Sequence, residues 1–220
     1  GEVASIIDQT LLQPTASEGR VQRFCEEAVG LGFAAVCIAP FWVNLAARIA
    51  RASKVRVCTV AGFPLGFEAA ESKVRTSQTA LDAGADEIDY VVNLGAVKGK
   101  NYGLVEAEME AMRLGAKNGV VKIILETGYL TEEEKKHLCK LAVRTELDFV
   151  KTSTGFGPSG ASVDDVRLLA ECCQGNIKVK AAGGIRTIQD LEAMVGAGAH
   201  RIGTSSGKEI IAQVEAMTKL

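Results

Sequence analysis

Short runs of aliphatic and β-branched residues recur along the whole chain and predict about eight strands. The predicted strands are 5–8, 35–38, 55–60, 87–92, 121–126, 149–152, 178–181 and 201–204. Their spacing of roughly 20 to 35 residues fits one strand followed by one helix. Segments with helical periodicity lie between them, most clearly at 104–118 and 131–146. The pattern therefore predicts strands and helices that alternate from one end of the chain to the other.

The starts and ends of the predicted helices carry recognisable signals. Thr131 is followed by Glu134, a capping box in which the hydroxyl accepts a backbone N–H and the carboxylate reaches back. Residues 187–190 imitate this pattern. Segments 83–88 and 197–202 have similar sequences, and in each a glycine ends a helix just before a strand. Such turns explain part of the high glycine content, 23 of 220 residues.

Alternating strands and helices predict an α/β fold, a parallel sheet covered by helices. Closure into a single-domain (β/α)8 TIM barrel over residues 1–220 fits the number of strands, although such barrels typically have about 250 residues. No linker or shift of composition divides the chain. The alternative is a doubly wound open sheet. That fold usually has fewer strands and a glycine-rich loop after the first one, a motif that this chain lacks.

The composition is that of an ordinary globular protein. Hydrophobic residues make up 47% and charged residues 24%, and 25 Lys and Arg against 27 Asp and Glu give a net charge of −2. A nearly neutral chain gives no reason to expect nucleic acid or an anionic membrane as a partner. No apolar run approaches the roughly 18 to 20 residues that span a bilayer. We therefore expect neither nucleic-acid nor membrane binding.

The cysteines and histidines bear on the compartment and on metal binding. The cysteines are Cys25, Cys37, Cys58, Cys139, Cys172 and Cys173. None forms a C-x-x-C pair and no signal peptide is visible, so we expect reduced core thiols in a cytoplasmic protein. His137 and His200 are too few and too isolated for a histidine-based metal site, so we expect no metal.

Several predicted strands carry charges, although parallel strands are buried on both faces and usually read as apolar runs. The charged residues are Asp8 at the end of the first strand, Asp89 within the fourth, Lys122 and Glu126 flanking the fifth, Lys151 ending the sixth and Lys180 ending the seventh. Side chains alternate along a strand, so Asp89 faces the barrel interior if Ile88 and Tyr90 face the helices. The same alternation turns Lys151 and Lys180 inward.

These inward charges have a structural and a functional interpretation. An isolated buried charge costs several kcal/mol, and even a paired one often fails to recover its desolvation cost. One interpretation is a closed ion network of Asp89 with Lys151 or Lys180 that holds the barrel together. The number of charges near one rim favours an active site, since barrel enzymes place their chemistry at the carboxyl ends of the strands. Lys178 begins its strand and is expected to be solvated, and His200 is expected to be structural.

Two lysines on adjacent strands, with a carboxylate nearby, form a complete set for imine chemistry. A lysine amine is protonated in water, with a pKa of about 10.4. Desolvation and a second cation both depress that pKa, and a neutral amine can attack an aldehyde to form a Schiff base. Asp89 could then move protons directly or through a water. One lysine would be the nucleophile and the other the neighbour that tunes its pKa.

Glycine-rich loops follow the seventh and eighth predicted strands. Their candidate anion-binding residues are Gly183, Gly184, Gly203, Ser205 and Ser206. Glycines let backbone N–H groups approach an anion, and a serine can cap the next helix, whose N-terminus favours negative charge. Each loop by itself could be an ordinary turn. Their shared position, where barrel enzymes often bind phosphate, predicts a phosphate site.

The chain resembles the deoxyribose-phosphate aldolase family over nearly its whole length. The most specific segments are 149–155 (FVKTSTG) and 178–186 (KVKAAGGIR), with support from 87–93 and 201–207. The resemblance implies a class I aldolase, a lyase on a (β/α)8 barrel that needs no metal or other cofactor. It implies reversible cleavage of 2-deoxy-D-ribose 5-phosphate to D-glyceraldehyde 3-phosphate and acetaldehyde, in deoxyribonucleotide catabolism.

The resemblance also implies roles for individual residues. It makes Lys151 the Schiff-base lysine, Lys180 the neighbour that lowers its pKa, and Asp89 the partner of Lys180 in proton transfer. The phosphate-binding positions that it implies are Gly183, Gly184, Ser205 and Ser206. It further implies a homo-oligomer, a dimer or a tetramer, in the cytoplasm, with a phosphorylated sugar as the small-molecule partner.

Two features depart from the family pattern. Many members have His where this chain has Gln9, which can still form hydrogen bonds, and some end in a tyrosine that assists proton transfer. This chain has no aromatic residue after Phe156. The alternatives are another Schiff-base barrel, such as a transaldolase or a different sugar-phosphate aldolase, and a non-catalytic barrel that binds a phosphorylated metabolite. The last one gives the two inward lysines no purpose.

Overall fold

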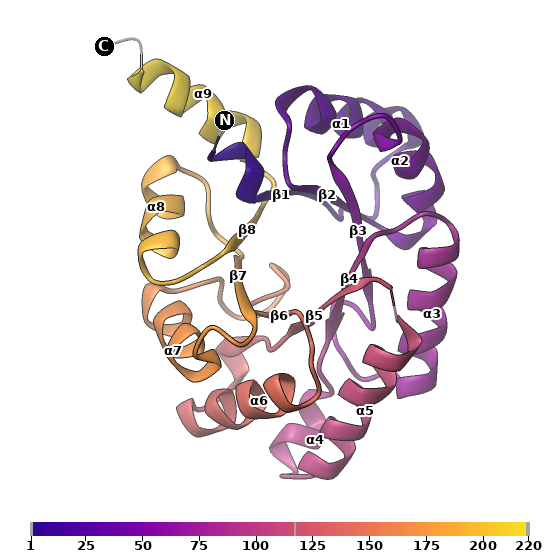
Figure 1. Ribbon diagram of the computed structural model, residues 1–220, viewed down its shortest axis with the longest axis vertical. Coiled ribbons are helices and arrows are strands. Elements are labelled where there is room, and N and C mark those ends of the chain that lie inside the picture. The colour runs from indigo at the N-terminus through magenta and orange to yellow at the C-terminus, as the bar shows by residue number, and fades with distance from the viewer. Residues whose placement is uncertain (1, 117, 219–220) are drawn as a thin grey trace.

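Parallel strands form a closed barrel at the centre of the molecule (Figure 1). The strands are β1 (Ile7–Leu11), β2 (Ala35–Ile38), β3 (Arg56–Ala61), β4 (Glu87–Val91), β5 (Val120–Ile124), β6 (Phe149–Lys151), β7 (Lys178–Ala182) and β8 (Arg201–Thr204). The computed structural model describes residues 2–116 and 118–218. Each strand pairs in parallel with its neighbours in sequence, and β8 pairs with β1 to close the ring. The predicted (β/α)8 barrel is confirmed, and the open-sheet alternative is wrong.

Helices form the outer layer around the strands (Figure 1). They are α1 (Glu18–Leu31), α2 (Val43–Ala50), α3 (Ala70–Asp82), α4 (Leu94–Lys98), α5 (Tyr102–Gly115), α6 (Glu132–Arg144), α7 (Val163–Cys173), α8 (Ile188–Gly196) and α9 (Gly207–Met217), with short 3-10 helices η1 (Ala4–Ile6), η2 (Pro40–Trp42) and η3 (Thr127–Tyr129). Thr131 and Thr187 cap α6 and α8 through the two predicted capping boxes. Within the described residues, none of these helices is long and apolar enough to cross a membrane.

The two similar segments of the sequence form the same turn, as predicted. Gly84 and Gly198 lie at φ angles of 108° and 114°, a conformation that side chains with a Cβ rarely adopt. A Cβ at either position would also collide with the Cβ of an alanine, Ala47 or Ala170. Each glycine therefore permits both the turn and its close approach to a neighbouring helix.

Most strand boundaries shift by one to three residues from the prediction, and the shifts in β1 and β7 change the place of charged residues. The first strand was expected at 5–8, but residues 4–6 form η1 and the strand continues through Gln9 and Thr10 to Leu11. These polar residues fit in the strand because Gln9 is buried and its side-chain oxygen accepts a hydrogen bond from the backbone of Gly207 at 2.9 Å. Asp8 is therefore the second residue of β1, not its last. Lys180 likewise lies in the middle of β7 rather than at its end.

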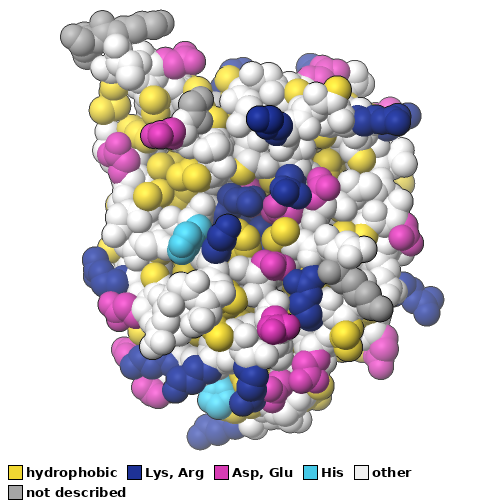
Figure 2. All heavy atoms as spheres, in the orientation of Figure 1, with side chains coloured by type: hydrophobic (Ala, Val, Ile, Leu, Met, Phe, Trp, Pro, Cys, Tyr) yellow, Lys and Arg dark blue, Asp and Glu magenta, His cyan; other side chains and the backbone are white. Residues whose placement is uncertain are grey.

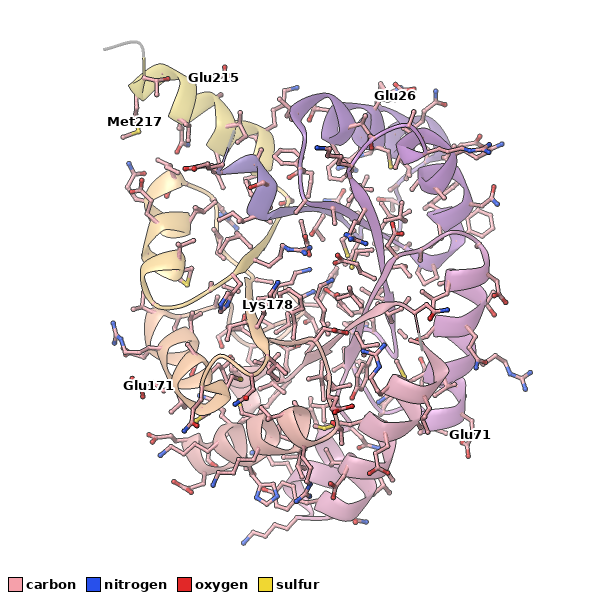
Figure 3. All side chains as sticks on the ribbon, in the orientation of Figure 1. Glu26, Glu71, Glu171, Lys178, Glu215 and Met217 are labelled. Carbon is pink, nitrogen blue, oxygen red and sulfur yellow. The ribbon has the colours of Figure 1, made fainter. Side chains whose placement is uncertain are left out.

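The main apolar core lies between the strands and the helices. Ile88 and Tyr90 are fully buried in it, which leaves Asp89 to face the barrel axis as predicted. Inside the barrel, a small apolar cluster around Cys37 and Cys58 occupies one side. The rest of the interior holds many side chains with nitrogen and oxygen atoms (Figure 3). Charged residues rather than an apolar core therefore fill much of the barrel.

Candidate active site

A network of charged side chains fills the barrel interior. Its carboxylates are Asp8, Glu87 and Asp89, and its cations are Lys122, Lys151, Lys180 and Arg201. The three carboxylates, Lys122 and Lys180 are fully buried. Side chains alternate along a parallel strand, so every second residue of these strands points to the axis. The network is thus built by strands that expose apolar residues to the helices and charged residues to the interior.

Asp89 is the centre of the network. Its Oδ1 accepts a hydrogen bond from Lys122 Nζ at 2.8 Å, and its Oδ2 accepts from Lys151 Nζ and from Lys180 Nζ, both at 2.8 Å. Burial by itself raises the pKa of Asp89, but these three ammonium groups outweigh it and hold the pKa well below its usual value. Asp89 is therefore an ionised carboxylate at neutral pH that connects three lysines.

Lys180 lies next to Lys151, as the sequence predicted. The two residues are register partners on β7 and β6, and both donate to Oδ2 of Asp89. Lys180 Nζ also donates to Oδ2 of Asp8 at 2.5 Å. Burial lowers the pKa of Lys180, but the carboxylates of Asp8 and Asp89 raise it above its ordinary value. Lys180 is consequently a permanent cation within the barrel.

The network reaches deeper into the barrel than predicted. Lys122 Nζ lies 2.5 Å from Glu87, and Arg201 lies 2.7 Å from Asp8 and 3.1 Å from Glu87. Glu87 and Arg201 are the first residues of their strands, so the charges extend far beyond the carboxyl-end rim. Figure 2 shows basic and acidic side chains together near the centre of the face that it presents. The expectation that the charges gather near one rim is wrong. Each buried charge needs partners of opposite sign, and Glu87 and Arg201 provide them from the amino-terminal ends of β4 and β8.

The sequence analysis did not single out Glu87 and Arg201. A signal for them was present, because Glu87 stands two residues before Asp89 and therefore on the same face of β4. Arg201 occupies the matching position in the second copy of the turn segment, where 197–202 repeats 83–88. Strand parity and the internal repeat together would have identified both residues.

Lys151 is the lysine of the network that lines a cavity. It is the last residue of β6, and its side chain lines a cavity of about 510 Å³. Among the described residues, its ammonium group has Asp89 as its one carboxylate partner within 4 Å. Its side chain retains 4% of its exposure, whereas those of Lys122 and Lys180 retain none. A small molecule in the cavity could therefore reach the amine of Lys151.

Most of the predicted phosphate-binding residues line the same cavity. They are Gly183, Gly184, Gly203 and Ser205. Gly183 and Gly184 have φ angles of 94° and 80°, so glycine is required for this turn. Ser206 is not among the lining residues. It precedes α9, where its backbone N–H donates to the hydroxyl of Thr204 at 2.9 Å.

Gln9 joins β1 to the loop after β8. Its Oε1 accepts from the backbone N–H of Gly207 at 2.9 Å, and its Nε2 donates to the carbonyl of Ser205 at 3.4 Å. The expectation that Gln9 can still form hydrogen bonds is thus confirmed. Through these bonds Gln9 fixes the backbone beside Ser205, at the edge of the cavity.

Three other residues were expected to lie outside the site. His200 accepts a hydrogen bond at Nδ1 from the backbone of Val179 at 3.2 Å, in agreement with a structural role. Lys178 is exposed at the start of β7, where Figure 3 labels it. His137 stacks on the ring of Tyr102 with 3.8 Å between the ring centroids. None of the three lines the cavity.

Two groups of side chains have metal-like spacing. The ligand atoms of Cys37, Cys58 and Asp89 lie within 4.8 Å of one another, and so do those of Asp8, Cys58 and Glu87. The carboxylates in both groups already accept hydrogen bonds or ion pairs from network cations. Positive charges at this distance oppose the binding of a divalent cation. The absence of a metal stays a prediction.

The family to which this barrel belongs is decided by a match over almost the entire chain. The model of the family described as DeoC/LacD family aldolase matches residues 3–213. The chain belongs to this family. A curated relative from Thermoanaerobacter sp. (strain X514), named deoxyribose-phosphate aldolase, is 47% identical over 212 residues, which cover 95% of each chain. The predicted resemblance is confirmed, and so is the class of enzyme, an aldolase.

Solved structures agree with the placement in the DeoC/LacD family. A structure described as QR15, an aldolase, has a TM-score of 0.95 and 41% identity, and the match covers 99% of this chain and 97% of the other. A structure described as a unique tetrameric deoxyribose phosphate aldolase from Aeropyrum pernix has a TM-score of 0.91 and 35% identity, with coverage of 98% and 92%. In this DeoC/LacD barrel, an amine, a permanent cation and an ionised carboxylate meet beside a glycine-rich cavity.

Proposed function

We propose that this chain reversibly cleaves 2-deoxy-D-ribose 5-phosphate to D-glyceraldehyde 3-phosphate and acetaldehyde, with Lys151 as the Schiff-base lysine. One observation carries the proposal. Lys151 shares Oδ2 of Asp89 with Lys180, and it lines one cavity together with the glycine-rich loops. A nucleophile, its neighbouring cation and an anion-binding surface thus surround the space that a phosphorylated sugar would fill.

The charge balance of the network supports Lys151 as the reacting amine. Four cationic side chains face three carboxylates within the barrel. Arg56, whose side chain is mostly exposed, also lies 3.8 Å from Glu87, so cations outnumber the carboxylates. Lys122 has three carboxylate partners and Lys180 has two, whereas Lys151 has one among the described residues. Lys151 therefore gives up the fewest ion pairs when its amine acts as the nucleophile.

The reaction follows from this arrangement. Lys151 attacks C1 of the open-chain sugar, and water leaves to give an iminium ion. A water held by Asp89 and Lys180 takes the proton of the C3 hydroxyl, and the C2–C3 bond breaks as its electrons move towards the iminium nitrogen. D-Glyceraldehyde 3-phosphate then leaves. Protonation of the remaining enamine at C2 and hydrolysis release acetaldehyde and restore Lys151.

The phosphate lies at the far end of the substrate from the reacting carbon. We assign it to the backbone N–H groups of Gly183 and Gly184 and to the loop with Gly203 and Ser205, which line the cavity. Ser206, beside this loop at the start of α9, would add the positive end of the helix dipole. Glu in place of Ser206 should therefore raise KM for a phosphorylated substrate.

Borohydride trapping tests the imine. The protein is incubated with 2-deoxy-D-ribose 5-phosphate and sodium borohydride, digested, and analysed by peptide mass. We expect irreversible loss of activity and a reduced adduct on the peptide that contains Lys151. Turnover without any adduct contradicts the imine mechanism. Turnover of another sugar phosphate, but not of this one, would favour a different Schiff-base aldolase or a transaldolase.

The same proposal includes an assembly and a compartment. We infer a cytoplasmic homo-oligomer, a dimer or a tetramer, in which residues 1–220 form one catalytic domain that needs no cofactor. Support comes from the tetramer described for the Aeropyrum pernix relative and from six cysteines that are all free thiols, which is typical of a reducing compartment. Light scattering on the purified protein tests the assembly, and a monomer at micromolar concentration contradicts it.

A further inference from the structure

The cavity beside Lys151 is lined by cations from three sides of the barrel mouth. Its charged lining residues are Arg20, Lys151 and Arg186, and no Asp or Glu of the described chain is among its lining residues. Lys151 belongs to the imine chemistry and Arg186 follows the glycine-rich loop. Arg20 belongs to neither group, because it stands on α1, which follows the neighbouring strand β1. A lining with one sign of charge attracts an anionic ligand.

The exposed side chain of Arg20 forms a hydrogen bond at the cavity wall. Its Nη1 donates to Oε1 of Gln13 at 2.5 Å, and both residues line the cavity. A guanidinium has five N–H donors, so this bond leaves most of them for a ligand. Within the described part of the chain, no carboxylate lies within the 4 Å of an ion pair with Arg20. Its charge is therefore positioned by a neutral amide and is not cancelled.

Arg186 is in a different position. Oδ2 of Asp190 accepts from the backbone N–H of Arg186 at 3.0 Å, which places a carboxylate beside this residue. Hydrogen bonds from the backbone of Arg186 and from Thr187 lower the pKa of Asp190, so it is ionised at neutral pH. Asp190 contacts the backbone of Arg186 and not its guanidinium, so the charges of Arg186 and Arg20 are both available to an anionic ligand.

We propose that Arg20, positioned by Gln13, binds the phosphate together with the loop of Gly183 and Gly184 and makes the enzyme select phosphorylated over unphosphorylated 2-deoxy sugars. The proposal rests on the proposed function, because it names a further contact for the same substrate. Guanidinium groups suit this task since their planar N–H pairs match two phosphate oxygens at once. The glycine-rich loops supply backbone donors, and Arg20 supplies the countercharge.

The comparison of two substrates tests this role. With Arg20→Gln, we expect KM for 2-deoxy-D-ribose 5-phosphate to rise about tenfold while kcat changes by less than about twofold, because the contact is far from the reacting carbon. Kinetics with unphosphorylated 2-deoxy-D-ribose should not change. The inhibition constant of inorganic phosphate, tested as a competitive inhibitor, should rise by a factor similar to the rise in KM.

Matched variants separate the contact from a general loss of surface charge. Arg23→Gln removes an arginine from the same helix that does not line the cavity, so KM should stay as in the unchanged protein. Arg20→Lys keeps the charge but loses the planar pair of donors, and should recover part of the affinity. Gln13→Ala leaves the arginine in place without its anchor and should raise KM less than Arg20→Gln does.

The outcomes distinguish this inference from the proposed function. If the unchanged protein does not turn over 2-deoxy-D-ribose 5-phosphate, the proposed function itself fails. If it does, and Arg20→Gln leaves KM for that substrate unchanged, Arg20 is not a phosphate ligand. The inference is also overturned if Arg20→Gln impairs both substrates equally, or if Arg23→Gln has the same effect as Arg20→Gln.

Discussion

The molecule contains two buried clusters of charge with opposite characters. One is the network inside the barrel, and the other is the Lys73–Glu108 pair that joins α3 to α5. Lys73 Nζ donates to the carbonyls of Gly66 and Val91 and to Oε2 of Glu108, each at 2.8 Å, so all three of its N–H donors are used. Lys151 has one such partner and lines a cavity. Burial of a charge alone therefore does not identify an active site; an unsaturated amine beside a cavity does.

The electrostatics of the two clusters also run in opposite directions. Desolvation raises the pKa of Glu108 and lowers that of Lys73, because the ion pair and the hydrogen bonds around it do not fully compensate for burial. In the barrel, several cations outweigh desolvation, so the pKa values of Asp8 and Asp89 are lowered. The isolated pair therefore compensates its desolvation only in part, whereas the network, with its excess of cations, stabilises its carboxylates in the ionised form. Under the proposed mechanism, that excess would leave the other cations ionised when one amine reacts.

The largest effect is expected from Lys151→Met. Turnover should fall by at least about a thousandfold, because the covalent step has lost its nucleophile. Folding should be preserved, since the variant removes the network cation with the fewest partners. Steady-state kinetics and thermal unfolding, measured on the same preparation, check both halves. A strongly lowered Tm would mean that Lys151 is structural, like Lys73.

Lys73→Met should lower the stability of the protein and leave its turnover nearly unchanged, the reverse of Lys151→Met. Removing one member of a buried pair takes the ammonium group away from two carbonyls and from Glu108, which keeps the backbone N–H of Asn93 as a donor. This change should cost about 3 kcal/mol of unfolding free energy. The activity of the folded fraction should change little. Urea unfolding measures the loss of unfolding free energy, and kcat at low temperature measures the activity of the folded fraction. If the single variant does not fold, Lys73→Met combined with Glu108→Leu should, because no uncompensated charge remains buried.

Asp89→Asn should affect the rate more than binding. Asparagine keeps the shape of the centre of the network but cannot accept a proton, so kcat should fall roughly a hundredfold with KM nearly unchanged. Asp89 also organises three lysines, so a structural role must be told apart from proton transfer. The split between kcat and KM does this, because loss of proton transfer lowers kcat at unchanged KM. A rise in KM alone would point to an orienting role.

The sequence predicted the site in part, for physical reasons that differ from residue to residue. Asp89, Lys151 and Lys180 could be found because each interrupts an apolar run at an inward position. Glu87 and Arg201 were missed because they stand at strand starts, where a charge usually lies in solvent. The excess of cations over carboxylates follows from tertiary packing, since strands distant in sequence supply the partners.

Arg20 and Lys73 were beyond the reach of the same reasoning. Both stand on helices among other charged residues, where a solvated position is the ordinary expectation. The packing of α1 against the mouth of the barrel brings Arg20 to the cavity, and the packing of α3 against α5 buries Lys73. Neither contact leaves a periodic signal in the sequence.

Acid should lower the stability that the barrel network provides, by less than the substitution of Lys73 does. The pKa of Asp8 is lowered from 3.8 to about 2; burial opposes this shift, but Lys180, Lys122 and Arg201 outweigh it. Ionised Asp8 therefore contributes fully above its unfolded pKa, and the contribution disappears as the pH falls through the folded value. The difference in unfolding free energy between the unchanged protein and Asp8→Asn should shrink by about 2 kcal/mol between pH 4 and pH 2.

Glu108 should respond to the same titration with the opposite sign. Because burial raises its pKa above 4.5, ionisation of Glu108 costs the folded state more than the unfolded one. As the pH falls through this raised pKa, the unchanged protein should gain stability relative to Glu108→Gln, whereas it loses stability relative to Asp8→Asn at lower pH. Urea unfolding of the three proteins from pH 7 to pH 2 measures both differences. Parallel curves for the two variants would show that the pair and the network share one electrostatic character, which removes the physical basis for separating them.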